Sequence, residues 1–478
     1  MKEISSILPY ACPQCKAQLT KTDHGFFCPR CQIKYPVKNN IPTLLPAEDL
    51  SQKNHFQFAG KDIPLLAGKL KTPFYLFSEK IIEENFRRIS SSFSQNGKIP
   101  LKIYYSAKTN YEPEVLKTLK GLGCGLEVAW GAEIYLAKKL GFKKENVCFD
   151  GPVKTIEDLK EAIKLGITIN ADSYTEVERI SQIASGLKKE ALVGFRINPG
   201  FENILPPPIR YYFTKFGVHK DRAPELYLKA SKLPGIKIIS ISSHIGSQIT
   251  SPKPYLKLVE NLVDLARVLE KKKFNIKEIN IGGGYPSTSL QLGWLKRIFN
   301  LASGDFHLRI PHLYEFGYSI SKKYAYEAQK LKSLPTLCIE PGRSLVSNAG
   351  ILVCKAAVIK ENSWVFLDGS KYAVPESLFF SQGKIVSANH YNEKMTTTYR
   401  IAGSSLNTGD IFSLNTKLPR LKKGDSVVIL DAGAYSISRA VQFTVLNPPI
   451  YYIRKNGKIE KIRRIGAYAD SLSPSIIK

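Results

Sequence analysis

The chain has 478 residues, of which 43% are hydrophobic and 23% are charged. This balance is typical of a globular protein with about three domains, and it excludes a disordered or fibrous chain. No stretch approaches 18 uncharged apolar residues, and the N-terminal segment is a poor match for a signal peptide. We therefore expect no transmembrane helix and a cytoplasmic protein.

The formal net charge is +28, and the basic residues are spread along the whole chain. A nucleic acid or another anionic partner is one explanation of such a charge. Basic runs such as residues 271–273 close apolar periodic stretches, as solvated helix ends do. We therefore favour a lysine-rich solvated surface and do not expect a nucleic-acid partner.

Four of the eight cysteines lie in the first 31 residues, as two Cys-x-x-Cys pairs separated by twelve residues. Each pair can chelate one tetrahedral Zn²⁺ from a tight turn, and a hairpin would bring the pairs together. Thiolates of a cytoplasmic chain bind metal more often than they form disulfides, although two disulfides remain the alternative. Four protein ligands leave no open position, so the expected metal is structural. The predicted ligands are Cys12, Cys15, Cys28 and Cys31.

The stretch Tyr35–Pro46 resembles the end of a Trm112-like zinc ribbon, a type of module that docks proteins or nucleic acids. We expect the ribbon to span residues 1–46 and a polar linker to span residues 47–71. The remaining cysteines stand alone in apolar surroundings, which favours core packing. They are Cys124, Cys148, Cys338 and Cys354.

From residue 72 to 345 the chain alternates short β-rich runs with amphipathic helices. One helix is predicted over Pro254–Lys273, because its apolar residues recur at helical spacing. Such alternation favours an α/β fold with a (β/α)₈ barrel, and a doubly wound sheet is the alternative. The predicted strands are Thr72–Phe77, Ile103–Tyr105, Val193–Ile197, Ile238–Ile241 and Ile279–Ile281.

After residue 345 strand-like runs recur with turn signals and little helix, which indicates a β-rich C-terminal domain over 346–478. The first strand, Thr72–Phe77, either opens the barrel or joins this domain. The strand-like runs are Ile351–Cys354, Trp364–Leu367, Val427–Leu430 and Tyr451–Ile453.

Several motifs follow predicted barrel strands, where side chains face the site of a barrel enzyme. Lys108 is placed to lose its proton and form a Schiff base, although alone it reads as a surface lysine. Gly282–Gly284 can cradle a phosphate or form a plain turn. Glu340 can keep a pyridine nitrogen protonated, and Arg343 can pair with a phosphate or a carboxylate; a surface salt bridge is the alternative. His244 can stack on a ring or serve a structural role.

In order along the chain, these motifs resemble those of the fold type III pyridoxal-phosphate decarboxylases, the group of diaminopimelate, ornithine and arginine decarboxylases. The resemblance runs from about residue 70 to the end and implies an alanine-racemase-like barrel followed by a C-terminal β-barrel domain. Eight motifs carry it, namely Tyr105–Asn110, Gly123–Glu133, Phe195–Pro199, Lys215–Gly217, His244–Gln248, Gly282–Gly284, Glu340–Gly350 and Asp431–Tyr435.

The resemblance implies pyridoxal phosphate as cofactor and a role for each matching residue. Lys108 would form the Schiff base, His244 would stack on the ring, and Glu340 would bind the pyridine nitrogen. Arg196 and Glu127 would line the ring. The family is also a head-to-tail homodimer, and we expect the same here. The phosphate would be held by Ser247, Gly283, Gly284, Gly342, Arg343 and Tyr435.

Two segments depart from the family pattern. Anchored by Gly403 and Asp410, the segment that carries the family's proton-donating cysteine places Leu406 at that position, and Asn407 replaces a glutamate that contacts the distal amine of diaminopimelate. Residues 373–376 lack the arginine that the family uses for a distal carboxylate. We therefore expect a substrate other than diaminopimelate, such as a siderophore precursor or a carrier-bound amino acid.

The expected activity is that of a decarboxylase of an amino acid or amino-acid conjugate. Since leucine donates no proton, the alternatives are another reaction outcome on the same cofactor, or a binding protein that acts through the ribbon. The ribbon is expected to dock a carrier protein or another enzyme of a pathway.

Overall fold

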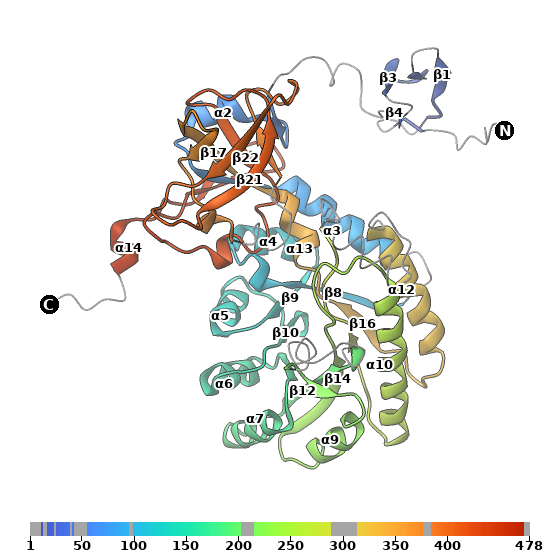
Figure 1. The fold of residues 1–478 in the computed structure, drawn as a ribbon. Coiled ribbons are helices and arrows are strands. Elements are labelled where there is room, and N and C mark those ends of the chain that lie inside the picture. The colour runs from blue at the N-terminus through green and yellow to red at the C-terminus, as the bar shows by residue number, and fades with distance from the viewer. Residues whose placement is uncertain are drawn as a thin grey trace.

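The computed structural model describes residues 11–12, 17–22, 25–38, 41–42, 55–94, 99–201, 215–287, 313–375 and 384–472. Figure 1 shows a strand barrel ringed by helices, a β domain beside it, and a small sheet near the N-terminus. Within these ranges, no helix is both long and apolar enough to cross a membrane.

Eight parallel strands form the barrel, and it is closed because the last strand pairs with the first. β16 pairs with β8 and β11 pairs with β12, so the sheet has no free edge among these eight strands. The closure confirms the predicted barrel and excludes the open, doubly wound sheet. In chain order the strands are β8 (Leu101–Ser106), β9 (Gly125–Val128), β10 (Val147–Phe149), β11 (Thr168–Ala171), β12 (Ala191–Asn198), β14 (Ile236–Ser242), β15 (Glu278–Asn280) and β16 (Thr336–Ile339).

Helices follow the barrel strands and cover the outside of the barrel (Figure 1). The longest helix in the described ranges, α10 (Lys253–Lys271), matches the helix predicted over 254–273, and its apolar stripe is buried as the periodicity requires. A short strand, β13 (Val218–His219), pairs with β12 outside the closed ring. The other helices are α3 (Glu79–Ser94), α4 (Pro113–Gly121), α5 (Gly131–Lys139), α6 (Ile156–Leu165), α7 (Tyr174–Gly186), α9 (Ala223–Ala230) and α12 (Leu313–Ala328).

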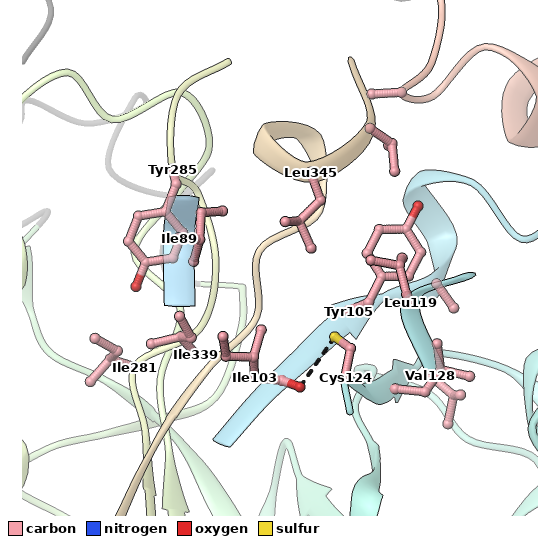
Figure 2. Close-up of a cluster of buried hydrophobic side chains, with 14 of the residues drawn as sticks. Ile89, Ile103, Tyr105, Leu119, Cys124, Val128, Ile281, Tyr285, Ile339 and Leu345 are labelled. Atoms are coloured by element: carbon pink, nitrogen blue, oxygen red, sulfur yellow. Dashed lines mark hydrogen bonds between the residues drawn. The ribbon is translucent and has the colours of Figure 1, made fainter. Parts of the chain in front are cut away.

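The hydrophobic core joins the barrel strands to the helices that cover them. Figure 2 shows part of it, where the Cys124 thiol donates to the carbonyl of Ile103 at 3.3 Å. The four isolated cysteines are at most 2% exposed, which confirms their predicted role in core packing. They are Cys124, Cys148, Cys338 and Cys354.

The β domain contains the strands after residue 345 together with one strand from before the barrel. β7 (Phe74–Ser78) pairs antiparallel with β17 (Gly350–Ile359) and parallel with β23 (Ile450–Ile453). The strand predicted over 72–77 therefore belongs to this domain and not to the barrel. The remaining strands are β18 (Trp364–Leu367), β19 (Ile385–Ser387), β20 (Thr397–Ala402), β21 (Ile411–Leu418), β22 (Ser426–Ile429) and β24 (Ile459–Arg463).

The prediction of a linker over 47–71 is wrong for its described part, residues 55–71. Strands β5 (Gln57–Phe58) and β6 (Lys61–Asp62) are followed by helix α2 (Ile63–Lys69), which the side chain of Asp62 caps. Phe56, Phe58, Ile63 and Ala67 are buried in a cluster with residues of β7, β17 and β22. These four apolar side chains, spaced among polar ones, explain why the segment packs onto the β domain.

The N-terminal region forms a separate small antiparallel sheet of four strands. Cys12, Cys28 and Tyr35 are buried in its own hydrophobic cluster. Cys15 lies outside the described residues. The strands are β1 (Thr20–Thr22), β2 (Gly25–Cys28), β3 (Ile33–Lys38) and β4 (Ile41–Pro42).

Candidate active site

Most of the predicted site residues lie at the carboxyl ends of barrel strands. Lys108 lies in the single turn η1 (Ala107–Thr109) that follows β8, and Glu127 lies on β9. His244, the glycine loop Gly282–Gly284 and Glu340 follow β14, β15 and β16. Because these strands are parallel and neighbouring, their ends meet on one face of the barrel.

The amine of Lys108 is held by the carboxylate of Glu127. The Lys108 Nζ lies 2.7 and 2.5 Å from the two carboxylate oxygens, and the Ser106 hydroxyl donates to one of them at 2.5 Å. Burial alone would lower the pKa of Lys108, but the charge of Glu127 raises it above the ordinary value. Burial likewise opposes the charged form of Glu127, yet Lys108 and Ser106 lower the pKa of this carboxyl. The pair is therefore ionic.

The His244 imidazole is held neutral beside the glycine loop. The backbone N–H of Gly283 donates to His244 Nδ1 at 3.1 Å, so the proton of the neutral ring lies on Nε2. Burial, followed by the positive charges of Arg196 and Lys108, lowers the pKa of His244 to about 3. A neutral, planar ring at this position is suited to stack on another ring.

The glycine loop requires glycine for steric reasons. Gly282 and Gly284 have φ of +70° and +98°, a region that side chains disfavour. A Cβ on Gly283 would lie 2.1 Å from the carbonyl oxygen of Glu340, and one on Gly284 would lie 2.3 Å from that of Gly246. The loop therefore packs closely against its neighbours, and its backbone contacts the side chains of Asn280 and His244 directly.

Glu340 is 7% exposed and surrounded by other acids. Asn280 Nδ2 donates to Glu340 Oε1 at 2.7 Å. Burial, together with the charges of Asp150 and Glu127, raises the pKa of Glu340 well above its ordinary value. A cation placed against this carboxyl would relieve that repulsion, so the position suits a protonated ring nitrogen.

The predicted phosphate-binding residues lie on three further segments. The Arg343 guanidinium lies 4.7 Å from the centre of the Tyr435 ring, and the backbone N–H of Tyr435 donates to the carbonyl of Thr109 at 2.8 Å. A Cβ on Gly342 would lie 2.2 Å from Thr109 Oγ1, so the start of helix α13 (Arg343–Val346) approaches the Lys108 turn closely. Ser247 is exposed on the loop after β14.

Arg196 lies on β12, and its guanidinium is 4.5 Å from the centre of the Phe216 ring. Burial, followed by the charge of Glu127, raises the pKa of Asp150, and the positive charge of Arg196 opposes this rise. The same charge helps to lower the pKa of His244. Arg196 is therefore electrostatically coupled to the acidic part of the site.

Sequence reasoning missed three buried polar residues at this end of the barrel. Asp150 directly follows β10, Asn170 lies on β11 and donates to Asp150 at 3.2 Å, and Asn280 ends β15. Each one closes or follows a short apolar run, and this signal marks residues at the carboxyl ends of barrel strands. The hydrogen-bond partners of these residues depend on which strands are neighbours in the barrel. The sequence alone does not show which strands are neighbours.

These residues fit pyridoxal phosphate. The site offers an amine, a neutral ring, a buried acid that gains from a cation, and a glycine loop for a phosphate. The barrel and this set of groups define the class of pyridoxal-phosphate-dependent enzymes of the alanine-racemase-like fold.

Comparison with known proteins shows to which family within this class of enzymes the chain belongs. Residues 79–347 match the family model described as pyridoxal-dependent decarboxylase, pyridoxal binding domain. The chain belongs to this family, and it is a pyridoxal-phosphate-dependent amino-acid decarboxylase, a lyase.

Among similar curated proteins is the diaminopimelate decarboxylase of Methanothermobacter thermautotrophicus, 29% identical over 436 residues, which covers 90% of this chain and 97% of that one. The enzyme of the same name from Zymomonas mobilis is 30% identical over 393 residues, 80% of this chain and 87% of that one. The crystal structure of diaminopimelate decarboxylase from M. jannaschii superposes with a TM-score of 0.80 at 27% identity, covering 89% of this chain and 97% of that one.

Proposed function

We propose that this decarboxylase acts on an amino acid or amino-acid conjugate other than diaminopimelate, such as a siderophore precursor or a carrier-bound amino acid. The observation that carries the proposal is Leu406, which is 94% exposed at the tip of the segment where the family has its proton-donating cysteine. An apolar side chain at this position neither donates a proton nor pairs with a charged substrate end.

A buried carboxylate supports the alignment on which this argument rests. Asp410 accepts hydrogen bonds from the Ser370 hydroxyl at 2.9 Å and from the backbone N–H groups of Lys371 and Ser405 at 2.8 and 2.9 Å. A Cβ on Gly403 would lie 2.2 Å from this carboxylate. Gly403 and Asp410 thus fix the two ends of the loop that presents Leu406. The second segment that departs from the family pattern is residues 373–376, which lack the family's arginine. Its last residue, Glu376, lies outside the described residues.

In this proposal pyridoxal phosphate, when bound, supplies the electron sink for the charge left on the α-carbon as CO₂ departs. Lys108 provides the amine that binds the cofactor, with Glu127 as its counter-ion. Glu340 faces the ring nitrogen, and His244 stacks on the ring. Gly283, Gly284, Gly342, Arg343, Tyr435 and Ser247 hold the phosphate.

The proton for the α-carbon then comes from another donor than cysteine. The candidates within this chain are Lys108, His244, Ser404, Ser405 or a tyrosine, and water is the candidate from solvent. A second candidate function is decarboxylation of diaminopimelate itself, which the names of the similar proteins favour.

The test begins with the visible absorption spectrum of the purified protein and of the Lys108→Ala variant. We expect a cofactor band in the wild type that the variant lacks. Release of CO₂ is then measured for diaminopimelate, other amino acids and carrier-bound amino acids. Turnover of diaminopimelate above all the others would overturn the substrate proposal, and a protein without any cofactor band would overturn the assignment of Lys108.

We also propose that Cys12, Cys15, Cys28 and Cys31 hold one structural Zn²⁺. The sulfur atoms of Cys12, Cys28 and Cys31 lie within 4.8 Å of one another, which is the spacing of ligands around one tetrahedral ion. We expect about one zinc per chain by elemental analysis and loss of that zinc in Cys28→Ser. Cys124→Ser is the matched control, because Cys124 is buried in the barrel core. A zinc content that Cys28→Ser leaves unchanged would refute this site.

The ribbon is proposed to dock a carrier protein or another pathway enzyme, and the enzyme is proposed to be a homodimer. Deletion of residues 1–46 should weaken binding of an acidic carrier protein while the dimer persists in sedimentation. The docking role fails if both partner binding and turnover are unchanged by the deletion.

A further inference from the structure

The side chain of Asn280 connects three segments of the candidate site. Asn280 is 3% exposed at the end of β15. Its Nδ2 donates to Glu340 Oε1 at 2.7 Å, and its Oδ1 accepts from the backbone N–H of Gly282 at 2.9 Å. Its backbone carbonyl accepts from Ser243 N–H at 2.8 Å, next to His244. One residue thus contacts the segments proposed to hold the phosphate, the ring face and the ring nitrogen.

The two hydrogen bonds of the Asn280 side chain use the two polar atoms of one amide group, Nδ2 as the donor and Oδ1 as the acceptor. An amide carries a donor and an acceptor on one planar group, which neither an apolar side chain nor an ionised carboxylate does. Because the site is buried, loss of either bond would leave an unsatisfied polar group, which is destabilising. The residue type is therefore specified by the two partners together.

Glu340 depends on this donor because its other neighbours are mostly acidic. In the described part of the chain, the other donor to Glu340 Oε1 is the Cys148 thiol, at 4.0 Å. The amide N–H of Asn280 favours the ionised form of Glu340, whereas burial and the nearby acids oppose it. The titratable groups that act on Glu340 or feel its charge are Lys108, Glu127, Cys148, Asp150, Tyr285 and Cys338.

We propose that Asn280 is a positioning residue of the decarboxylase. Its N–H orients Glu340 as a carboxylate toward the ring nitrogen of the cofactor, while its carbonyl oxygen fixes the start of the glycine loop at the phosphate end. The inference rests on the proposed role of Glu340 and extends it to a residue that does not touch the cofactor.

The substitution Asn280→Asp separates the two contacts, because it retains the shape and the acceptor for Gly282. It donates to Glu340 only while the new carboxyl is protonated. We expect the variant to resemble the wild type at pH 6. At pH 8.5 we expect kcat to fall at least about tenfold with little change in KM, and the visible band of the bound cofactor to shift. Since an amide does not titrate, the wild type should lack this pH dependence.

Asn85→Asp is the matched control. Asn85 is 1% exposed on helix α3 and donates to the carbonyl of Leu345 at 2.9 Å and to Asn348 Oδ1 at 2.7 Å. It contacts neither Glu340 nor the glycine loop through these bonds. The same pH dependence in this variant would mean that any buried carboxyl causes the effect, and the inference would be overturned. A pH profile of Asn280→Asp identical to the wild type would overturn it as well.

Two further variants test the inference if Asn280→Asp does not fold, and test separately the proposed role of Glu340. If Asn280→Asp fails to fold by circular dichroism, Asn280→Ser should show a lowered kcat at every pH, and an unchanged kcat would refute the inference. Glu340→Gln tests the underlying assignment. An unchanged cofactor spectrum in Glu340→Gln would refute the role of Glu340, whereas a changed spectrum there and none in Asn280→Asp would refute the inference about Asn280 alone.

Discussion

At the scale of single residues, the candidate site is governed by charged groups whose partners are specific. Lys108 and Glu127 neutralise each other at 2.5 Å, and His244 is kept uncharged. The site thereby holds a cationic amine paired with one acid, and a second acid, Glu340, whose hydrogen-bond donors among the described residues are the Asn280 amide and the Cys148 thiol. This asymmetry is what the cofactor's aldehyde and ring nitrogen require.

Replacement of Glu127 by glutamine should speed the capture of pyridoxal phosphate by the apoprotein. Without the carboxylate, the pKa of Lys108 falls, and more of the amine is unprotonated at pH 7. Each unit of pKa corresponds to about a tenfold change in free amine, so we expect at least about a tenfold faster capture in stopped-flow absorbance.

The control for Glu127→Gln is Glu176→Gln. Glu176 pairs with the buried Lys154 at 2.9 Å, whereas Lys108 pairs with Glu127. That variant should lose stability and capture the cofactor at the wild-type rate. Equal capture rates in Glu127→Gln and the wild type would mean that Glu127 does not hold the proton on Lys108.

Gly283→Ala should weaken cofactor binding by at least about tenfold, which corresponds to about 1.4 kcal/mol. The added Cβ would lie 2.1 Å from the Glu340 carbonyl, so the loop must move away from its place in the site. The dissociation constant is measured by fluorescence titration with pyridoxal phosphate. Gly186→Ala is the control, because a Cβ there meets nothing within 4 Å. Similar constants for both variants would contradict the steric argument.

At the scale of elements, helix α4 joins the barrel to the β domain through ion pairs. Arg463 of β24 pairs with Glu112, which precedes α4, and Arg454 pairs with Glu114 and Glu460. Thr118 of α4 also shares a hydrogen bond of 2.7 Å with the Tyr452 hydroxyl. These contacts fix the helix after the Lys108 turn against β23 and β24.

Arg463→Met should destabilise the protein more at pH 8 than at pH 5. Burial raises the pKa of Glu112, and Arg463 opposes this shift. Without the arginine the folded-state pKa rises further, so the folded chain loses stability as pH rises through that value. We expect a loss of about 2 kcal/mol at pH 8, less than for a fully buried pair because the arginine is 37% exposed.

The measurement for Arg463→Met is urea denaturation at the two pH values. Arg464→Met is the matched control, since Arg464 pairs with Asp470 on the surface. We expect its midpoint to match the wild type at both pH values. A loss in Arg463→Met that is equal at pH 5 and pH 8 would exclude ionised Glu112 as the cause.

At the scale of the whole molecule, the two domains are interleaved along the chain. β7 fills the position between β17 and β23, although it precedes the barrel in sequence. The change in sequence pattern suggests a domain boundary at residue 345. The β domain nevertheless includes β7, which lies before the barrel in the sequence.

A fragment of residues 346–478 should fail to fold alone, because β17 and β23 would each lose β7 as a neighbour and the sheet would be divided between them. Fusion of residues 55–78 in front of it should restore a folded domain, since these residues supply β5, β6, α2 and β7. Amide-exchange NMR of the two fragments is the measurement. A folded 346–478 fragment without β7 would contradict this view of the domain.

The features of the fold that can be predicted from the sequence are those that depend on a local pattern of residues. The helix over 254–273, the strands around Tyr105 and Ile241, and the burial of the isolated cysteines follow from periodicity and hydrophobicity. The motif residues at the carboxyl ends of strands lie on one face of the barrel because the barrel strands are parallel. The place of β7, the packing of residues 55–70 and the contacts of Asn280 depend on which distant segments are neighbours. No local pattern carries that information.

The position of β7 also shapes the time course of folding. Phe77 pairs with Gly350 and Tyr75 pairs with Ile450, so about 270 or more residues separate the partners in each pair. Contacts of such long range slow folding, because a large loop must close before they form. On the ribosome, β7 emerges early and waits unpaired while the whole barrel is synthesised. Every chain that stops before residue 450 leaves a hydrophobic strand open to other chains, which makes prematurely ended products prone to aggregate.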